Sequence, residues 1–255
     1  MALRIGRVPY LHAEPFYVDM ARRGLMLTEL TPRAVAVAAA NGEIDAGPVP
    51  LVDCVRLEDR FQPVAGFCLA SVQEAGSCLL FSTKPIEALA GAHISVTDEA
   101  SIAPRLLDVL LRLKYQVQTA SYGPLQAPHE AFLLIGNQGL RQRMGVPDFP
   151  YTYDLGTEWH AWTGLPFVFS RWMVRQDVSP KDLAQLAEAL YVGLEEGVDT
   201  LGQLAEPRPD LAMLPRDIAV YIQGFRYFMG RSEQQAIEQF RRYLEQLGGE
   251  GQCKR

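Results

Sequence analysis

Residues 3–15 read LRIGRVPYLHAEP, a short apolar run that Pro9 ends and a histidine follows. A run of this length bounded by a proline predicts a strand over residues 3–8. Ligands of open α/β sheets lie beyond the carboxyl ends of the strands, where His12 and the preceding Tyr10 are expected. The pattern is equally consistent with a structural histidine. Glu14 could also reach a ligand there, or it could be a solvated acid in the first turn of a helix.

Short apolar runs alternate with helical periodicity along the first two thirds of the chain. The predicted strands are residues 3–8, 44–49, 78–81, 94–96, 132–135 and 167–169. Predicted helices cover residues 33–40 and the stretches that begin at Ser101 and Ser179. The last third is predicted to be entirely helical, with an apolar stripe at Ile218, Tyr221, Ile222 and Phe225. This alternation indicates an α/β protein with largely parallel sheets.

Domain organisation is predicted from the absence of a linker. No Gly/Ser-rich segment or repeat separates the two sets of strands. Two lobes that exchange strands, with crossovers near residues 82 and 171, fit this pattern better than two consecutive domains. We therefore expect one lobe to contain residues 1–82 and 171–255, with the C-terminal helices, and the other to contain residues 83–170.

Composition excludes several classes of protein. The 255 residues are 48% hydrophobic and 21% charged, which is ordinary for a globular chain with a buried core. The net charge of −6 argues against a nucleic-acid binder and a polybasic membrane-surface protein. No apolar run is long enough to span a membrane or to form a secretion signal, so we expect a cytoplasmic protein.

Common catalytic and metal-binding signatures are missing. The sequence has no GxGxxG after a strand, no GxxxxGK[ST], no HExxH and no GxSxG. Its four cysteines are too sparse for a disulfide framework and show no CxxC spacing. The four histidines are far apart, so their spacing indicates no metal site.

Two further segments are candidates for ligand binding. Ser101 opens a predicted helix after a strand, and the free N–H groups of Ile102 and Ala103 would form an anion site there. Ser101 could also be only a helix cap. Gly136 and Asn137 follow another predicted strand, where glycine allows close backbone approach. A simple strand-to-helix turn is as consistent with that pair.

Three blocks of sequence carry a family resemblance. The first reads VPYLHAEP over residues 8–15, and the second reads SCLLFSTKP over residues 77–85. The third reads YDLG at 153–156, EW at 158–159 and TGLPFVF at 163–169. These blocks resemble the chorismate dehydratases of the futalosine route to menaquinone, whose first two motifs are close to V-x-Y-L-N-A-x-P and S-V-x-L-x-S-K-x-P. The resemblance covers most of residues 3–175.

The resemblance implies a fold and an activity. The fold is two-lobed, like the type II periplasmic binding proteins, with a mostly parallel sheet flanked by helices in each lobe and the ligand in a cleft between lobes. The activity is that of a lyase that removes water from chorismate to give 3-[(1-carboxyvinyl)oxy]benzoate. The family implies no metal and no organic cofactor. The expected partner is thus a small-molecule dicarboxylate, with no nucleic acid or membrane, and the oligomeric state stays open.

The resemblance also suggests site residues. The expected substrate-binding residues are Tyr10, Ser77, Ser101, Ile102, Ala103, Gly136 and Asn137. Ser77, Ser101 and the backbone after Ser101 would anchor the carboxylates of the dianionic substrate. His12 is the catalytic candidate, for hydrogen bonding to the departing hydroxyl or for proton transfer. A carboxylate of the substrate is the alternative proton acceptor.

Three motifs depart from the family pattern, at four positions. His12 stands where the family has Asn, and Asn137 stands where it has Asp. Ala103 and Pro104 replace two residues with hydroxyl groups. The alternatives to the lyase are a small-carboxylate binding protein of the same fold, the related dihydroxynaphthoate synthase of the same pathway, and a ligand-sensing module. The synthase usually opens with S-P-C-P-N-D, which this chain lacks, and no helix-turn-helix precedes residue 3.

Overall fold

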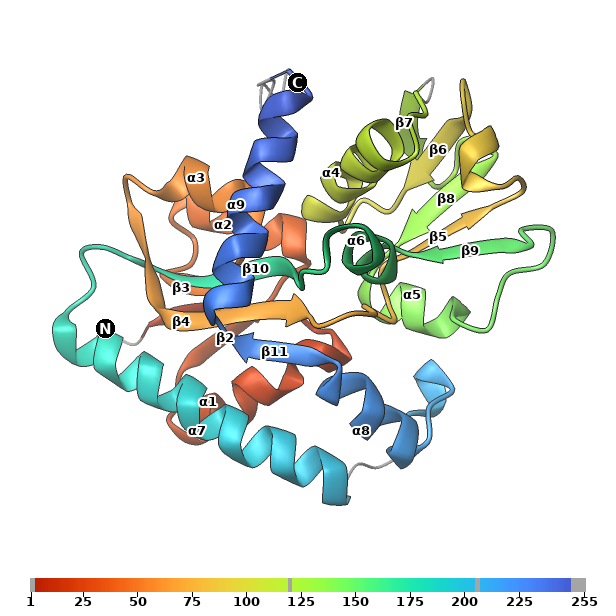
Figure 1. Cartoon of the computed structure of the whole chain (residues 1–255). Helices are drawn as coiled ribbons and strands as arrows, with labels where there is room; N and C mark the ends of the chain where they lie inside the picture. Colours follow the sequence, from red (N-terminus) through yellow and green to blue (C-terminus); the bar gives the residue numbers. More distant parts are fainter. Residues whose placement is uncertain (1–2, 119–120, 205–206, 249–255) are drawn as a thin grey trace. The chain divides into compact units, whose positions relative to one another are not determined.

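The computed structural model describes residues 3–118, 121–204 and 207–248 (Figure 1). The chain divides into two compact units. Unit 1 contains Met1–Ala70 and Val168–Met229, and unit 2 contains Ser71–Phe167 and Gly230–Arg255. The chain therefore crosses between the units at residues 70–71, 167–168 and 229–230.

Unit 1 is built on a six-stranded sheet with the order β11-β4-β10-β3-β1-β2. Its strands are β1 (Arg4–Arg7), β2 (Met26–Glu29), β3 (Ala46–Pro50), β4 (Phe61–Ser71), β10 (Phe167–Arg175) and β11 (Phe225–Phe228). β1 pairs in parallel with β2 and β3, whereas β10 pairs antiparallel with β3. The sheet is therefore mixed.

The helices of unit 1 include the segment that carries His12. They are η1 (Leu11–Tyr17), α1 (Val18–Arg22), α2 (Pro32–Asn41), α3 (Leu51–Leu57), α7 (Pro180–Leu204), η4 (Pro209–Leu211) and α8 (Pro215–Gln223). The long helix α7 packs along η1 and α1 (Figure 1). Gly193 of α7 makes this close approach possible, because a Cβ there would lie 2.9 Å from the carbonyl oxygen of Pro15.

Unit 2 is built on a five-stranded sheet with the order β7-β6-β8-β5-β9. Its strands are β5 (Leu79–Ser82), β6 (His93–Val96), β7 (Ser121–Pro124), β8 (Ala131–Leu134) and β9 (Tyr151–Asp154). β6 pairs in parallel with β7 and β8, and β5 pairs antiparallel with β8 and β9. Leu79, Phe81 and Leu134 form a buried cluster on this sheet.

The helices of unit 2 come from its two separate stretches of chain. They are η2 (Ile86–Ala88), α4 (Ile102–Val109), the π-helical turn η3 (Leu110–Lys114), α5 (Gly136–Gln142), α6 (Leu155–Thr163) and α9 (Arg231–Gln246). Phe240 of α9 packs against Trp159 and Phe167, with ring centroids 5.8 and 5.1 Å away. These contacts hold the C-terminal helix on unit 2.

The predicted α/β class is confirmed, but the sheets are mixed rather than mostly parallel. Antiparallel pairs are formed by β10 with β3 and by β5 with β8 and β9. β5 follows the first crossing between the units, and β10 spans the second. Neither strand enters its sheet through a βαβ crossover, which is the connection that makes neighbouring strands parallel.

The division into units differs from the predicted one at residues 71–82 and 230–255, and by three residues at 168–170, which belong to unit 1. Residues 71–82 belong to unit 2, because β5 pairs with β8 and β9 of that unit. Residues 230–255 also belong to unit 2, since α9 packs on α4 and on Trp159. The apolar periodicity of α9 predicted a helix but could not show which sheet it covers.

The sequence predicted that the last third of the chain is entirely helical, and this prediction is wrong. Gly224 ends α8, and Phe225–Phe228 forms strand β11 with alternating buried and exposed side chains. The N–H of Met229 then donates to the carbonyl of Gly66 at 2.8 Å, beside β4. Phe225, the last residue of the predicted apolar stripe, thus lies in β11 and not in the helix.

Two further findings concern the described residues. None of the helices in the described ranges is long and apolar enough to cross a membrane. Cys54, Cys68 and Cys78 are buried thiols that are not in disulfides, and Cys253 lies outside the described residues.

Candidate functional site

The 3-10 helix η1 places His12 directly after β1. Pro9 precedes the turn, and Tyr10 keeps an extended backbone (φ −108°, ψ 144°) before the helix begins. The hydroxyl of Tyr17 accepts a hydrogen bond from the backbone N–H of Val8 at 3.0 Å. This bond fixes the end of the 3-10 helix against the end of the strand.

His12 is surrounded by aromatic side chains and is only 8% exposed. Its ring centroid lies 5.6 Å from that of Tyr10 and 5.0 Å from that of Phe225. Its Nδ1 atom lies 2.7 Å from the hydroxyl oxygen of Tyr221. The backbone carbonyl of His12 accepts a hydrogen bond from the hydroxyl of Tyr227 at 3.0 Å. Ring and backbone of this residue are thus both held.

Burial lowers the pKa of His12 to about 3, because desolvation disfavours the charged imidazolium. The side chain is therefore neutral near pH 7, with one ring nitrogen as donor and the other as acceptor. A neutral imidazole can hydrogen bond to a hydroxyl group. It supplies no positive charge for a carboxylate, so anion partners must come from elsewhere.

Glu14 forms an ion pair with Arg208. Its Oε1 atom lies 2.7 Å from a terminal nitrogen of that guanidinium, and both side chains are 30% exposed. Arg208 also pairs with Asp210 at 3.3 Å. The ion pair ties η1 to the segment before η4, which favours a structural role for Glu14 over ligand contact.

The other predicted site residues meet at one edge of the sheet of unit 2. β6 and β8 are parallel neighbours, so their carboxyl ends share this edge, and the antiparallel β5 begins there. Ser101 follows β6, Gly136 follows β8, and Ser77 precedes β5. We call this group the sheet-edge cluster; its members are Ser77, Ser101, Ile102, Ala103, Gly136 and Asn137. Tyr10 and His12 lie in unit 1 and are not part of it.

Helix α4 begins at the sheet-edge cluster, as predicted. Ser101 occupies the N-cap position, but its side chain makes no capping hydrogen bond with the first turn. Ser101 is therefore the N-cap by position, and its side chain does not bond to the first turn. The backbone N–H groups at the start of a helix have no partner inside the helix and attract anions. Ile102 and Ala103 present such groups.

Helix α5 begins near the segment that precedes α4. Gly136 has a left-handed backbone (φ +55°), which glycine adopts without strain. The side-chain amide of Gln138 donates to Glu99 Oε1 at 2.8 Å, which ties the start of α5 to the segment before α4. Asn137, between these two residues, brings an amide group to the cluster.

The backbone of Ser77 packs tightly against α5. A Cβ at Gly139 would lie 2.2 Å from the carbonyl oxygen of Ser77, so only glycine fits at that position. The hydroxyl of Ser77 donates to the carbonyl of Ala75 at 3.3 Å. The position of Ser77 therefore depends on both α5 and the loop before β5.

Asp154 holds the loop that carries Ser77. Its carboxylate accepts hydrogen bonds from the backbone N–H groups of Ala75, Gly76 and Thr157 at 2.9, 2.7 and 2.8 Å. Burial nevertheless raises the pKa of Asp154, because desolvation outweighs these bonds. The same side chain caps α6, so it joins that helix to the Ser77 loop.

Sequence reasoning missed the partners of two expected residues. Tyr221 was assigned only to an apolar stripe, and Tyr227 and Asp154 were given no role. Helical periodicity shows that Tyr221 faces inward. It cannot show contact with His12, which lies 209 residues earlier in the chain.

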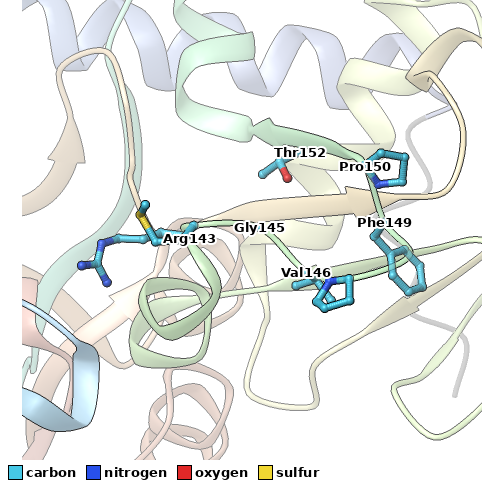
Figure 2. Close-up of a pocket in the computed structure, with 8 residues that line it drawn as sticks. Arg143, Gly145, Val146, Phe149, Pro150 and Thr152 are labelled. Carbon is cyan, nitrogen blue, oxygen red and sulfur yellow. The ribbon is translucent and has the colours of Figure 1, made fainter.

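A shallow cavity of about 520 Å³ lies elsewhere in unit 2 (Figure 2). It is lined by Arg143, Met144, Gly145, Val146, Pro147, Phe149, Pro150 and Thr152. Figure 2 shows the Arg143 side chain pointing away from Phe149 and Pro150. The cavity contains none of the predicted site residues. Within the described ranges, no group of three or more His, Cys, Asp or Glu side chains could hold a metal ion.

Comparisons with known proteins connect this chain to a biosynthetic family. A sequence model of the family described as menaquinone biosynthesis matches residues 3–246. The chain is also 24% identical to a chorismate dehydratase of Thermus thermophilus over 256 residues, which covers 92% of this chain and 93% of the relative.

Solved structures show the fold. A protein from Archaeoglobus fulgidus has a TM-score of 0.73 at 15% identity, covering 97% of this chain and 98% of that one. An alkanesulfonate-binding protein from Xanthomonas axonopodis pv. citri has a TM-score of 0.60 at 11% identity, covering 97% and 92%. A Candida albicans protein with the generic periplasmic binding protein fold has a TM-score of 0.59 at 9% identity, covering 100% and 92%. The chain therefore has the predicted two-lobed, periplasmic-binding-protein-like fold.

Proposed function

The chain belongs to the menaquinone-biosynthesis family, and on this basis we propose that it is a lyase that dehydrates chorismate to 3-[(1-carboxyvinyl)oxy]benzoate. The observation that carries the proposal is the similarity to a chorismate dehydratase over 92% of this chain. Because that relative is a biosynthetic enzyme, the proposal also places the protein in the cytoplasm. Loss of water makes the ring aromatic, so the protein has chiefly to bind and orient the substrate.

The sheet-edge cluster is proposed to bind the carboxylates of the substrate. Chorismate is a dianion, whereas the chain has a net charge of −6. Helix N-termini supply local positive potential that a net negative charge does not cancel at short range. The N–H groups of Ile102 and Ala103 and the hydroxyl of Ser101 would donate to these carboxylates. The hydroxyl of Ser77 would do the same after turning from the carbonyl of Ala75, since it has a single hydrogen to donate. Gly136 and Asn137 would complete the binding site.

His12 is proposed to act on the departing hydroxyl group, and Tyr10 to pack against the substrate. In the elimination, the bond between ring carbon and hydroxyl breaks, and the neighbouring ring carbon loses its proton. The electron pair of that C–H bond becomes the third double bond of the ring. Hydroxide and proton leave together as water, so no group on the protein gains a net charge. Hydrogen bonding from a neutral imidazole would weaken the C–O bond.

The proposal is tested by incubating the purified chain with chorismate and separating the products by liquid chromatography and mass spectrometry. The expected product is lighter than chorismate by one water and absorbs as a substituted benzoate. Full conversion is expected, because aromatisation makes the step effectively irreversible. Unchanged chorismate from a correctly folded protein would overturn the proposal.

Two variants separate the proposed roles. His12→Ala is expected to lower kcat by at least about tenfold, as for loss of a group that acts on the reacting bond. Ser101→Ala is expected to raise KM by about tenfold with little change in kcat, because it removes one hydrogen bond to a charged ligand group. Circular dichroism checks that both variants fold. If either folded variant has near wild-type kinetics, the role proposed for that residue is wrong.

A second candidate is a non-catalytic binding protein for a small carboxylate. The observation that favours it is the structural similarity to an alkanesulfonate-binding protein, which was solved with MOPS bound. Thermal shift with chorismate, in a sample that shows no product, would support this candidate. Product formation would exclude it.

A further inference from the structure

The hydrogen bond between His12 and Tyr221 joins two distant parts of unit 1. Nδ1 of the imidazole lies 2.7 Å from the hydroxyl oxygen of Tyr221, and the residues are 209 positions apart. Tyr221 is on α8, and its ring packs against Phe225 with centroids 5.2 Å apart. Phe225 in turn lies 5.0 Å from the ring of His12. The ring of Tyr221 is therefore held by packing where its hydroxyl contacts the imidazole.

We propose that Tyr221 is a positioning residue that holds His12 as the tautomer with its proton on Nε2, so that Nε2–H donates to the departing hydroxyl of the substrate. The identity of that hydroxyl rests on the proposed function. The tautomer itself is a property of the protein without substrate. Neither residue is then required to change its charge during the reaction.

The direction of the hydrogen bond follows from the two groups. A phenol is a stronger acid than the N–H of a neutral imidazole, and an unprotonated imidazole nitrogen is a stronger acceptor than a phenol oxygen. The hydroxyl of Tyr221 therefore donates, and Nδ1 accepts. Which ring nitrogen of a histidine carries the proton is set by the bond that the other nitrogen makes. Nε2 consequently carries the hydrogen.

The surroundings of His12 favour an imidazole that donates a hydrogen bond over one that accepts a proton. Tyr10 and Phe225 pack against the ring, and no ion pair with His12 is present among the described residues. The nearest charged side chain in the sequence, Glu14, is paired with Arg208. Because burial also keeps the imidazole uncharged near pH 7, Nε2–H can polarise the C–O bond without first gaining a proton.

The proposed contribution is one of geometry and hydrogen-bond direction. As the bond from ring carbon to hydroxyl breaks, negative charge develops on the departing oxygen, and Nε2–H stabilises it. That oxygen then takes the proton from the neighbouring ring carbon and leaves as water. The imidazole begins and ends the reaction neutral, and the Tyr221 hydroxyl keeps its proton throughout.

The test measures the tautomer directly by nitrogen NMR of protein that contains ¹⁵N-histidine, without substrate. The His12 signals are identified by their absence from His12→Asn. In the wild-type protein we expect a protonated Nε2 and an unprotonated Nδ1. In Tyr221→Phe we expect a mixture of the two tautomers. Protonated Nδ1 in the wild-type protein, or an unchanged tautomer in Tyr221→Phe, would overturn the inference.

Tyr227→Phe is the matched control for this measurement. It also removes one partly buried phenol hydroxyl next to His12, but that hydroxyl donates to the backbone carbonyl rather than to the ring. We expect its His12 signals to keep the wild-type tautomer. A loss of tautomer preference in both variants would mean that packing alone sets it, and would overturn the role of Tyr221.

Activity provides a second readout. Tyr221→Phe is expected to lower kcat on chorismate by about tenfold and to leave KM within about twofold, since the substrate carboxylates bind elsewhere. In the His12→Asn background the same substitution is expected to have no effect, because no imidazole remains to be positioned. An equal loss in both backgrounds would contradict the inference. If the wild-type protein shows the expected tautomer but no turnover of chorismate, the proposed function fails and the tautomer assignment stands.

Discussion

Replacing His12 by Asn should make the protein less sensitive to acid. Burial lowers the pKa of His12 from 6.5 to about 3. Between these values the unfolded chain binds a proton at this residue and the folded chain does not. Stability therefore falls as the pH falls through this window. The destabilisation by His12 reaches its full size below pH 3, because there the folded chain also binds the proton and the difference between the two states no longer grows.

The magnitude follows from the two pKa values. At pH 5, an imidazole with a pKa of 6.5 gains about 2 kcal/mol from protonation, and one with a pKa of about 3 gains almost nothing. At pH 7 the difference is only about 0.2 kcal/mol. Lowering the pH from 7 to 5 should thus cost the wild-type protein about 2 kcal/mol more than it costs His12→Asn.

Urea unfolding at pH 7 and pH 5, followed by circular dichroism, measures this difference for both proteins. All other titrating groups are shared, so the difference of the two pH effects isolates His12. An equal loss of stability in the two proteins would refute the reasoning and would show that His12 takes up a proton in the folded state. Nitrogen NMR gives a direct check, with His12 signals that stay constant from pH 8 to pH 5.

Three further substitutions test the positions of the two groups of site residues. Gly139→Ala should destabilise the protein by about 1–3 kcal/mol, because its Cβ would lie 2.2 Å from the carbonyl oxygen of Ser77. Gly193→Ala should cost a similar amount, about 1–3 kcal/mol, and displace η1, because its Cβ would lie 2.9 Å from the carbonyl oxygen of Pro15. Asp154→Asn should cost about 2 kcal/mol, since an amide cannot accept all three backbone hydrogen bonds. Urea unfolding measures all three.

Gly123→Ala is the control for the glycine variants. The nearest heavy atom to a Cβ there lies 3.6 Å away, which is ordinary contact, so a change within about 0.5 kcal/mol is expected. If Gly139→Ala is as stable as the wild-type protein, the close packing of α5 on Ser77 is contradicted. The same result for Gly193→Ala contradicts the close packing of α7 on η1. For Asp154, the contrary result is an Asn variant as stable as the wild-type protein.

Local signals in the sequence predicted the structural positions of two candidate residues, His12 and Ser101. Pro9 marks the end of β1, which located His12 at the carboxyl end of a strand. The step from an apolar run to Ser101 located the start of α4. Both depend on residues that are neighbours in sequence, which is why they could be predicted.

Long-range pairing could not be predicted in the same way. The sequence leaves two roles open for Glu14, and only its ion pair with the distant Arg208 favours the structural one. The strand β4 is long, but its pattern of buried and exposed residues is irregular, and it was not predicted. Sheet order and the partner of Tyr221 depend on contacts between residues far apart in the chain, which periodicity does not record.

The three crossings between the units determine the order in which the sheets can be completed during synthesis. All five strands of the unit 2 sheet lie within residues 79–154 of one continuous segment. In the unit 1 sheet, β10 lies between β3 and β4, although it is made more than a hundred residues after β3. A chain that emerges from the ribosome N-terminus first cannot close the unit 1 sheet until β10 is available.

The unit that begins second can therefore form its sheet first. Until β10 arrives, β3 and β4 expose backbone edges that would pair with other strands, which makes this the aggregation-prone stage of folding. The helix α9, which is made after the strands of both sheets, then packs on unit 2. Translation speed over the segment between β4 and β10 sets how long these edges stay exposed in the nascent chain.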